Sequence, residues 1–220
     1  MNKDRIFTTL YVLVALLVLL AATAGPRWLY LMSKPLIMIS LLGWSAISAD
    51  SRSVRQKPLL LAGLAFACIG DIFLMFDGFF LHGLGAFLVM QVLYIFVFSG
   101  EIRRPLPVFP SLLKAFVLIV ALGIILMMVV PHLSDPVLRI AVPVYAFTIT
   151  AMTFFAFLRN SGVTGLSFRM VAGGTVFFMI SDTLIALNAF VGPVAHHHFW
   201  IMSTYMIAQF SILTGMLKVR

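Results

Sequence analysis

The sequence predicts an all-α, polytopic membrane protein with eight transmembrane helices. Of its 220 residues, 62% are hydrophobic and only 10% are charged, and the mean hydropathy is +1.12. A soluble domain could not cover that much apolar surface. The apolar stretches are unbroken, unlike the alternating pattern of barrel strands. No segment is polar enough to form a separate soluble domain, so we expect residues 1–220 to form one transmembrane domain.

Eight apolar stretches have about the 20 residues that a membrane-spanning helix needs. The first follows Lys3 and Arg5 and ends near a possible signal-peptidase site at Ala22-Thr23-Ala24. It is longer than the ~7–15-residue core of a signal peptide, so we expect a retained first helix. The eight expected spans are 6–23, 26–49, 58–76, 80–99, 109–130, 136–158, 169–190 and 197–217.

Basic residues gather at one set of helix ends, which is typical of the cytoplasmic side. Both termini are therefore expected in the cytoplasm of a bacterium, and all five histidines at the outer ends. The net charge of +8 reflects topology rather than nucleic-acid binding. The outer ends carry only Arg27, Lys34 and Arg139. The cytoplasmic set is Lys3, Arg5, Arg52, Arg55, Lys57, Arg103, Arg104, Lys114, Arg159, Arg169, Lys218 and Arg220.

An internal repeat is centred on two intramembrane aspartates. Asp71 lies inside the third span, and its surroundings recur around Asp182 with a constant spacing between equivalent positions. Apolar residues recur by chance in any hydrophobic sequence, but chance explains the aligned Asp and Tyr pairs less well. We therefore expect halves 1–108 and 109–220, parallel to each other, with a site between them. The aligned pairs are Gly63–Gly174, Phe66–Phe177, Ile69–Ile180, Asp71–Asp182, Phe79–Phe190 and Tyr94–Tyr205.

Three ionisable residues are expected at one depth. At ~1.5 Å per residue, Lys34 and Asp182 lie roughly 12 Å and Asp71 roughly 9 Å below the outer end of their helices. This predicts a shared polar cavity, in which Asp71 and Asp182 act as general acid and base. Alternatively, one Asp only pairs with Lys34 to hold the bundle together. Lys34 itself is expected to bind a lipid phosphate, to tune an Asp, or to reach the outer interface as an anchor.

Further polar residues on three spans are candidates for substrate binding. Tyr near helix ends is often an interfacial anchor, but Tyr94 and Tyr145 lie too deep for that. We expect these side chains to line the cavity and to hydrogen-bond a headgroup or a water. The candidates are Gln91, Tyr94, Tyr145, Tyr205 and Gln209.

Ser181 and the histidines carry weaker expectations. Ser181 precedes Asp182 and is a candidate for the site, but no His is placed nearby to activate it as a nucleophile, which favours helix packing. His196, His197 and His198 are consecutive, so they point in different directions and rarely form one zinc site. We expect no metal and no cofactor. Cys68 has no disulfide partner in the chain.

In order and spacing, these landmarks resemble the YhhN-type transmembrane lysoplasmalogenase family over nearly the whole chain. One position departs from the family pattern, because Gln91 stands where the family usually has His. The matching segments are Lys34-Pro35, Gly70-Asp71, the run from Phe80 to Tyr94, Tyr145, the segment Gly173–Asp182, and Tyr205 with Gln209.

The resemblance implies hydrolysis of the vinyl ether bond of lysoplasmalogens, with lysoplasmenyl-ethanolamine or lysoplasmenyl-choline as substrate and a fatty aldehyde as product. A lysophospholipid and membrane lipid would then be the partners. Two other function classes stay open. A transporter also has repeated halves with buried charges, and it would release no new product. A metal-dependent hydrolase of amides or esters would lose activity with a chelator.

Overall fold

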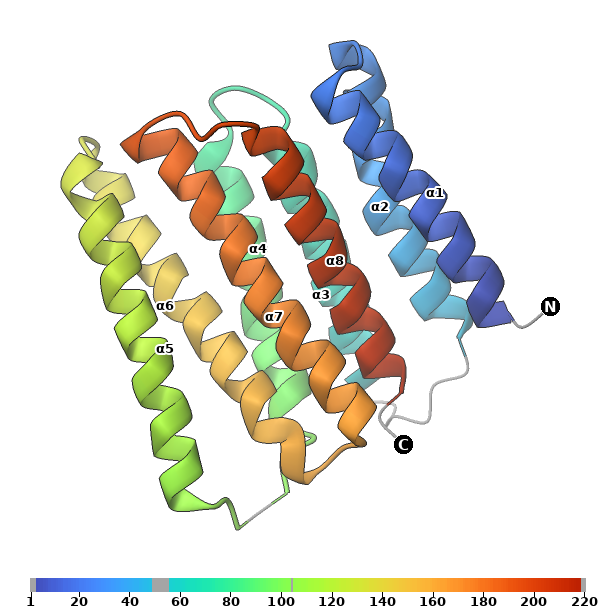
Figure 1. Cartoon of the computed structure of the whole chain (residues 1–220), viewed down its shortest axis with the longest axis vertical. Coiled ribbons are helices and arrows are strands. Elements are labelled where there is room, and N and C mark those ends of the chain that lie inside the picture. Colours follow the sequence, from blue (N-terminus) through green and yellow to red (C-terminus); the bar gives the residue numbers. More distant parts are fainter. Residues whose placement is uncertain (1–2, 49–55, 104, 219–220) are drawn as a thin grey trace.

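The computed structural model describes residues 3–48, 56–103 and 105–218, and these fold into an up-and-down bundle of eight α-helices (Figure 1). Each helix is long and apolar enough to cross a membrane, which confirms the predicted fold class. The helices are α1 (Lys3–Thr23), α2 (Arg27–Ile47), α3 (Gln56–Phe73), α4 (Phe80–Ser99), α5 (Val108–Val129), α6 (Pro136–Leu158), α7 (Gly165–Ala186) and α8 (His197–Leu217).

The helix bounds differ from the predicted ones mainly at α7. This helix begins at Gly165, before the expected start, because the Thr164 side chain accepts a hydrogen bond from the Ser167 amide and caps it. It continues past Ala186 as a π-helix, Leu187–Val191. The wider turns of this segment occupy the place where the sequence predicted a regular last turn.

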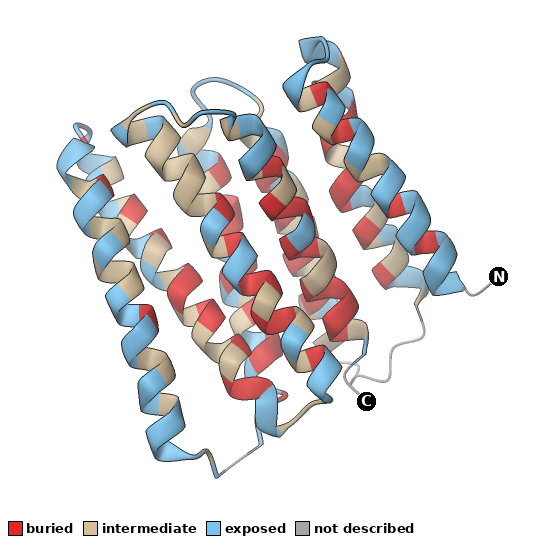
Figure 2. Cartoon of the chain, in the orientation of Figure 1, coloured by how far each residue is buried: buried red, intermediate tan, exposed pale blue. Residues whose placement is uncertain are grey.

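Burial is unequal among the helices (Figure 2). In α8, 56% of the apolar stretch is buried, whereas in the stretch that begins with α5 the share is 11%. The helix α8 packs against α1, α2 and α7, while α5 packs mainly on α6 and the π-helix. The bundle is therefore built around α8, and α5 is held at its edge.

Two glycines allow close contacts between neighbouring helices. A Cβ at Gly63 of α3 would lie 2.5 Å from the ring of Tyr94 on α4. A Cβ at Gly174 of α7 would lie 2.8 Å from the side chain of Ile212 on α8. Small residues permit such approach between helices in lipid, where packing drives association. The α3–α4 and α7–α8 pairs are the most extensively packed pairs of the bundle.

A buried ion pair ties together the end of the bundle where the chain termini lie. Arg159 is fully buried after α6, and its guanidinium donates to the Glu101 carboxylate, with Nε 2.6 Å and Nη2 2.5 Å from Oε2. It also donates to Ser167, whose hydroxyl donates to the Gly215 carbonyl of α8. The sequence had placed Arg159 among the charges at the membrane surface, yet it organises four helix ends.

Both chain ends lie at the same end of the bundle (Figure 1). An even number of crossings requires this arrangement, and the expected cytoplasmic side of that end stays a prediction. Four of the basic residues on which the expectation depends, Arg52, Arg55, Arg104 and Arg220, lie outside the described residues.

Substitution of Arg159 by Met should lower the free energy of unfolding by about 3–5 kcal/mol, because it leaves the Glu101 charge buried without its cation. Denaturant titration in detergent, followed by tryptophan fluorescence, measures the change. The control is Asp77→Asn, which removes the exposed Arg27–Asp77 pair and should have no measurable effect. Equal effects of the two substitutions would contradict a structural role for the buried pair.

Candidate functional site

Asp71 forms an ion pair inside the bundle. Its Oδ1 lies 3.6 Å from the Lys34 ammonium of α2, and the side chains of Lys34 and Asp71 are only 8% and 4% exposed. The Tyr205 hydroxyl of α8 donates to Oδ2 at 2.6 Å, and Gln209 donates to that hydroxyl at 3.4 Å. The Lys34 ammonium also lies 5.8 Å from the centre of the Tyr30 ring. The carboxylate is thus compensated by one cation and one strong hydrogen bond.

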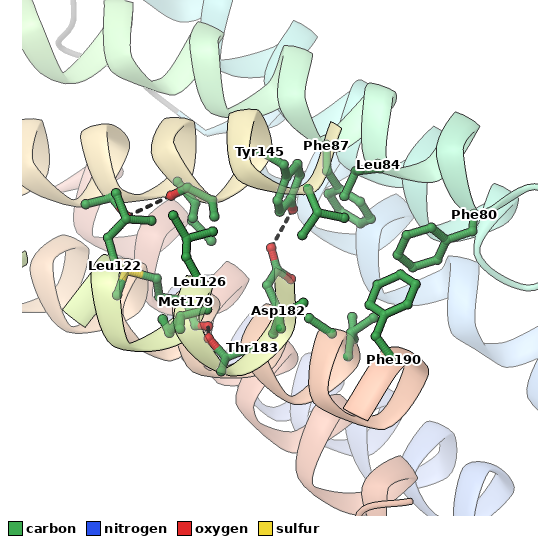
Figure 3. A pocket seen from close by; sticks show the side chains of 18 of the residues that line it. Phe80, Leu84, Phe87, Leu122, Leu126, Tyr145, Met179, Asp182, Thr183 and Phe190 are labelled. Atoms are coloured by element: carbon green, nitrogen blue, oxygen red, sulfur yellow. Dashed lines mark hydrogen bonds between the residues drawn. The ribbon is translucent and has the colours of Figure 1, made fainter. Parts of the chain in front are cut away.

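Asp182 occupies a different environment. The Tyr145 hydroxyl of α6 donates a hydrogen bond to Oδ2 (Figure 3), and no ion pair among the described residues includes this aspartate. Gln91 of α4 is fully buried beside the Tyr145 hydroxyl. Neither polar atom of its amide has a partner at hydrogen-bond geometry in the described part of the chain. Asp182 is therefore bonded to a phenol where Asp71 is paired with an ammonium.

Three aromatic rings connect the two aspartates. Tyr205 packs edge-on against Phe87, with centroids 6.2 Å apart, and lies 5.8 Å from Phe178. Phe87 and Phe178 are themselves 6.0 Å apart. Tyr205 donates a hydrogen bond to Asp71, and Phe87 lines the same cavity as Asp182. Each carboxyl group therefore has its own hydrogen-bond donor, Tyr205 for Asp71 and Tyr145 for Asp182.

Only one of the two aspartates lines a cavity, which we call the main cavity because a carboxyl group inside the bundle forms part of it; a surface groove lined by α1, α2, α7 and α8 is larger. The main cavity lies between α4, α5, α6 and α7, and Asp182 with Tyr145 forms its polar part (Figure 3). Phe80 and Phe190 meet edge-to-face at 5.5 Å, and the remaining lining is almost entirely aliphatic and aromatic. The volume open to water-sized molecules is about 60 Å³, so side chains must move apart before a lipid chain can enter.

The other candidates are placed as follows. Tyr94 is fully buried against Gly63 at the α3–α4 contact. Ser181 donates to the Ile201 carbonyl of α8 at 3.1 Å, as expected of a serine that packs helices. Lys34 is engaged by Asp71 and Tyr30, so it reaches neither the surface nor the main cavity. The structure thus brings Lys34, Asp71 and Tyr205 together on one side.

The histidines do not form a metal site with one another. Within residues 3–48, 56–103 and 105–218 there is no group of three or more His, Cys, Asp or Glu side chains that could hold an ion. His197 and His198 have ring centroids 4.0 Å apart at the start of α8, and His198 approaches the Tyr30 ring at 6.4 Å.

Sequence reasoning missed the aromatic members of the site. Phe87 and Phe178 had no polar atom to mark them, and Tyr30 was not considered. One signal was present in the sequence, because the spacing that aligns Asp71 with Asp182 also aligns Lys34 with Tyr145. These two residues are the ones that contact the two aspartates.

Comparison with known proteins places the chain among membrane enzymes. The model of the YhhN family matches residues 29–216. The human (Homo sapiens) protein named lysoplasmalogenase TMEM86A is 31% identical over 213 residues, covering 92% of this chain and 84% of that protein. Human lysoplasmalogenase TMEM86B is 29% identical over 191 residues, 87% of this chain and 76% of its own. Bovine (Bos taurus) lysoplasmalogenase TMEM86A is 30% identical, with 92% and 84% covered. No solved structure gives a significant match.

Substitution of Lys34 by Met should destabilise the fold by about 3–5 kcal/mol, since it leaves the Asp71 carboxylate buried without its cation. The matched control is the double variant Lys34→Met with Asp71→Asn, which removes both charges and should regain most of that stability. Denaturant titration of both variants measures the difference. A double variant as unstable as the single one would show that the ion pair is not what holds these helices.

Proposed function

The chain belongs to the YhhN family, and we propose that it hydrolyses the vinyl ether bond of lysoplasmalogens to a fatty aldehyde and a glycerophospho-headgroup. Relatives named lysoplasmalogenase match most of its length, and the chain is a multi-pass membrane hydrolase. Lysoplasmenyl-ethanolamine and lysoplasmenyl-choline are the proposed substrates. The reaction uses Asp71 and Asp182 and needs neither a metal nor a covalent intermediate.

The chemistry of a vinyl ether sets the requirements on the site. A carboxylic acid delivers a proton to the carbon that does not bear oxygen, and the electron pair of the double bond forms the new C–H bond. This leaves an oxocarbenium ion. Water adds to the oxygen-bearing carbon and gives its proton to a carboxylate. The resulting hemiacetal then breaks into the aldehyde and the glycerol hydroxyl, so the carboxyl groups end as they began.

The single observation that carries the proposal is the position of Asp182 in the main cavity. A carboxyl group stands at the polar part of a slot that is otherwise lined by apolar side chains. An alkenyl chain enters when these side chains move apart, and the apolar lining then excludes the bulk water that would compete for the proton. The Tyr145 hydroxyl holds the carboxyl group against the slot. A second carboxylate, Asp71, is paired with Lys34 and accepts a hydrogen bond from Tyr205, whose ring packs against Phe87 of the cavity lining.

The finer topology is part of the same proposal. We place both termini in the cytoplasm and the chain in the cytoplasmic membrane of a bacterium, because basic residues gather at the end that carries the termini. We also propose that the bundle consists of two parallel halves of four helices. The matching packing of α3 with α4 and of α7 with α8 supports this division.

Purified protein in detergent should release aldehyde from lysoplasmenyl-ethanolamine, with or without EDTA, whereas Asp71→Asn and Asp182→Asn should release almost none. Loss of a general acid or base costs about 10²–10⁴-fold in rate. Trapping of the aldehyde as a hydrazone measures the product. Absence of aldehyde with folded wild-type protein would favour the transporter interpretation, and activity in both variants would exclude this site.

Substitution of Ala146, which lines the cavity one residue after Tyr145, by Phe should raise KM by about 10-fold or more, because the ring takes up space that the alkenyl chain needs. The control is Ala141→Phe on the same helix, which lines a groove on the outer surface instead. Steady-state kinetics of the two variants measures the contrast. Equal KM values would place the chain-binding slot elsewhere.

A further inference from the structure

Asp71 and Asp182 are contacted by different residues that occupy equivalent positions in the two halves of the chain. The spacing that relates Asp71 to Asp182 also relates Lys34 to Tyr145. Lys34 on α2 pairs with Asp71 on α3, and Tyr145 on α6 donates to Asp182 on α7. In each half, therefore, the aspartate on the third helix is contacted by a residue of the second helix. One of these contacts carries a positive charge and the other does not.

Contacts between the halves follow a corresponding pattern. The fourth helix of the second half, α8, places the Tyr205 hydroxyl on Asp71. The fourth helix of the first half, α4, places Gln91 beside Tyr145. The same spacing relates α2 to α6 and α4 to α8, so the contact between α2 and α8 is equivalent to the contact between α4 and α6. Halves related by a twofold pseudo-symmetry axis produce contacts of this kind.

The difference between an ammonium and a phenol decides the protonation of a buried carboxyl group. Next to the Lys34 ammonium, the ionised form of Asp71 is compensated, and removal of its proton leaves a neutral pair. Asp182 has no cation among the described residues, and its cavity is lined almost entirely by apolar side chains. A lone carboxylate in such surroundings is costly, and a carboxyl group there avoids the cost by keeping its proton.

We infer that the residue at this equivalent position, Lys34 in one half and Tyr145 in the other, determines the roles of the two carboxyl groups. Asp182 is the catalytic acid, and Asp71 stays ionised. The inference rests on the proposed vinyl ether hydrolysis and assigns roles within it. Asp71 does not line the main cavity; paired with Lys34, it accepts the hydrogen bond of Tyr205 and acts as a positioning residue. Asp182 alone touches the reacting atoms.

The hydrogen bond of Tyr145 determines which oxygen of Asp182 delivers the proton. The phenol donates to Oδ2, and Oδ1 has no hydrogen-bond partner among the described residues, so Oδ1 carries the proton toward the substrate carbon. Once ionised, the same carboxylate accepts the proton of the attacking water. Tyr145 is therefore a positioning residue.

The groups that face Asp182 are consistent with a neutral carboxyl group. Tyr145 faces it from α6 and donates a hydrogen bond to Oδ2, and the Asp71 charge on α3 is compensated by Lys34. The residues that α4 and α5 contribute to the cavity are apolar, and Thr183 is the other polar residue that α7 contributes to it. No cation faces it from any of these helices within the described residues.

A matched pair of substitutions at Tyr145 tests the assignment. Both Tyr145→Met and Tyr145→Lys remove the phenol with side chains of similar length, and only the second supplies a cation. Lysine should make Asp182 resemble Asp71, fix it as a carboxylate and lower kcat by about 10²-fold or more relative to methionine, the scale of a lost general acid. Aldehyde release by folded protein of both variants measures the ratio. Equal kcat values would overturn the assignment.

Chemical rescue provides a second test that does not depend on the folding of the lysine variant. Added formate should restore aldehyde release to Asp182→Gly by about 10-fold or more, in proportion to undissociated formic acid, because the added acid replaces the missing donor. Asp71→Gly should gain nothing from the undissociated acid. The reverse pattern would overturn the assignment, whereas absence of aldehyde in wild-type protein would instead refute the proposed function.

Discussion

The ion pair between Lys34 and Asp71 is the constraint on which the arrangement of the bundle depends. A charge within lipid costs several kcal/mol unless it is compensated, so neither residue is tolerated without the other. Their contact requires α2 and α3 to meet at one depth, and the hydrogen bond from Tyr205 adds α8 to the same point. The most buried helix of the bundle is thereby fixed against the first half.

The second half meets the same constraint in a different way. Asp182 is bonded to Tyr145 and faces an apolar cavity, so its environment favours a neutral group rather than a compensated charge. The rings of Phe87 and Phe178 pack against each other, and Phe87 also lines the cavity. The opposite side of the cavity is formed by α5, which is the least buried helix and is held mainly by α6 and the π-helix. The Asp182 carboxyl group therefore lies between its hydrogen-bonded partner, Tyr145, and the apolar side of the cavity that α5 forms.

The sequence was sufficient to predict the eight spans and the polar centres, because long apolar runs and intramembrane charges are strong signals. Lys34, Asp71 and Tyr205 were expected near one another and do meet. A pair between Lys34 and one aspartate was an expected alternative, but the choice of Asp71 was not predictable, since helix rotation is set by packing, as at Gly63 and Gly174. The burial of Arg159 was not predictable for a related reason. Positive charge at a helix end usually marks the membrane surface, and nothing in the sequence showed that Glu101 would meet it inside.

The measurement that tests the central claim most directly is infrared spectroscopy of the purified protein near neutral pH, comparing wild type with Asp182→Asn and with Asp71→Asn. A protonated carboxyl group has a C=O stretching band that a carboxylate lacks. The account predicts that this band is lost in Asp182→Asn and retained in Asp71→Asn. A band that disappears with Asp71 and survives the loss of Asp182 would contradict the account, because the proton would then belong to the aspartate that pairs with lysine.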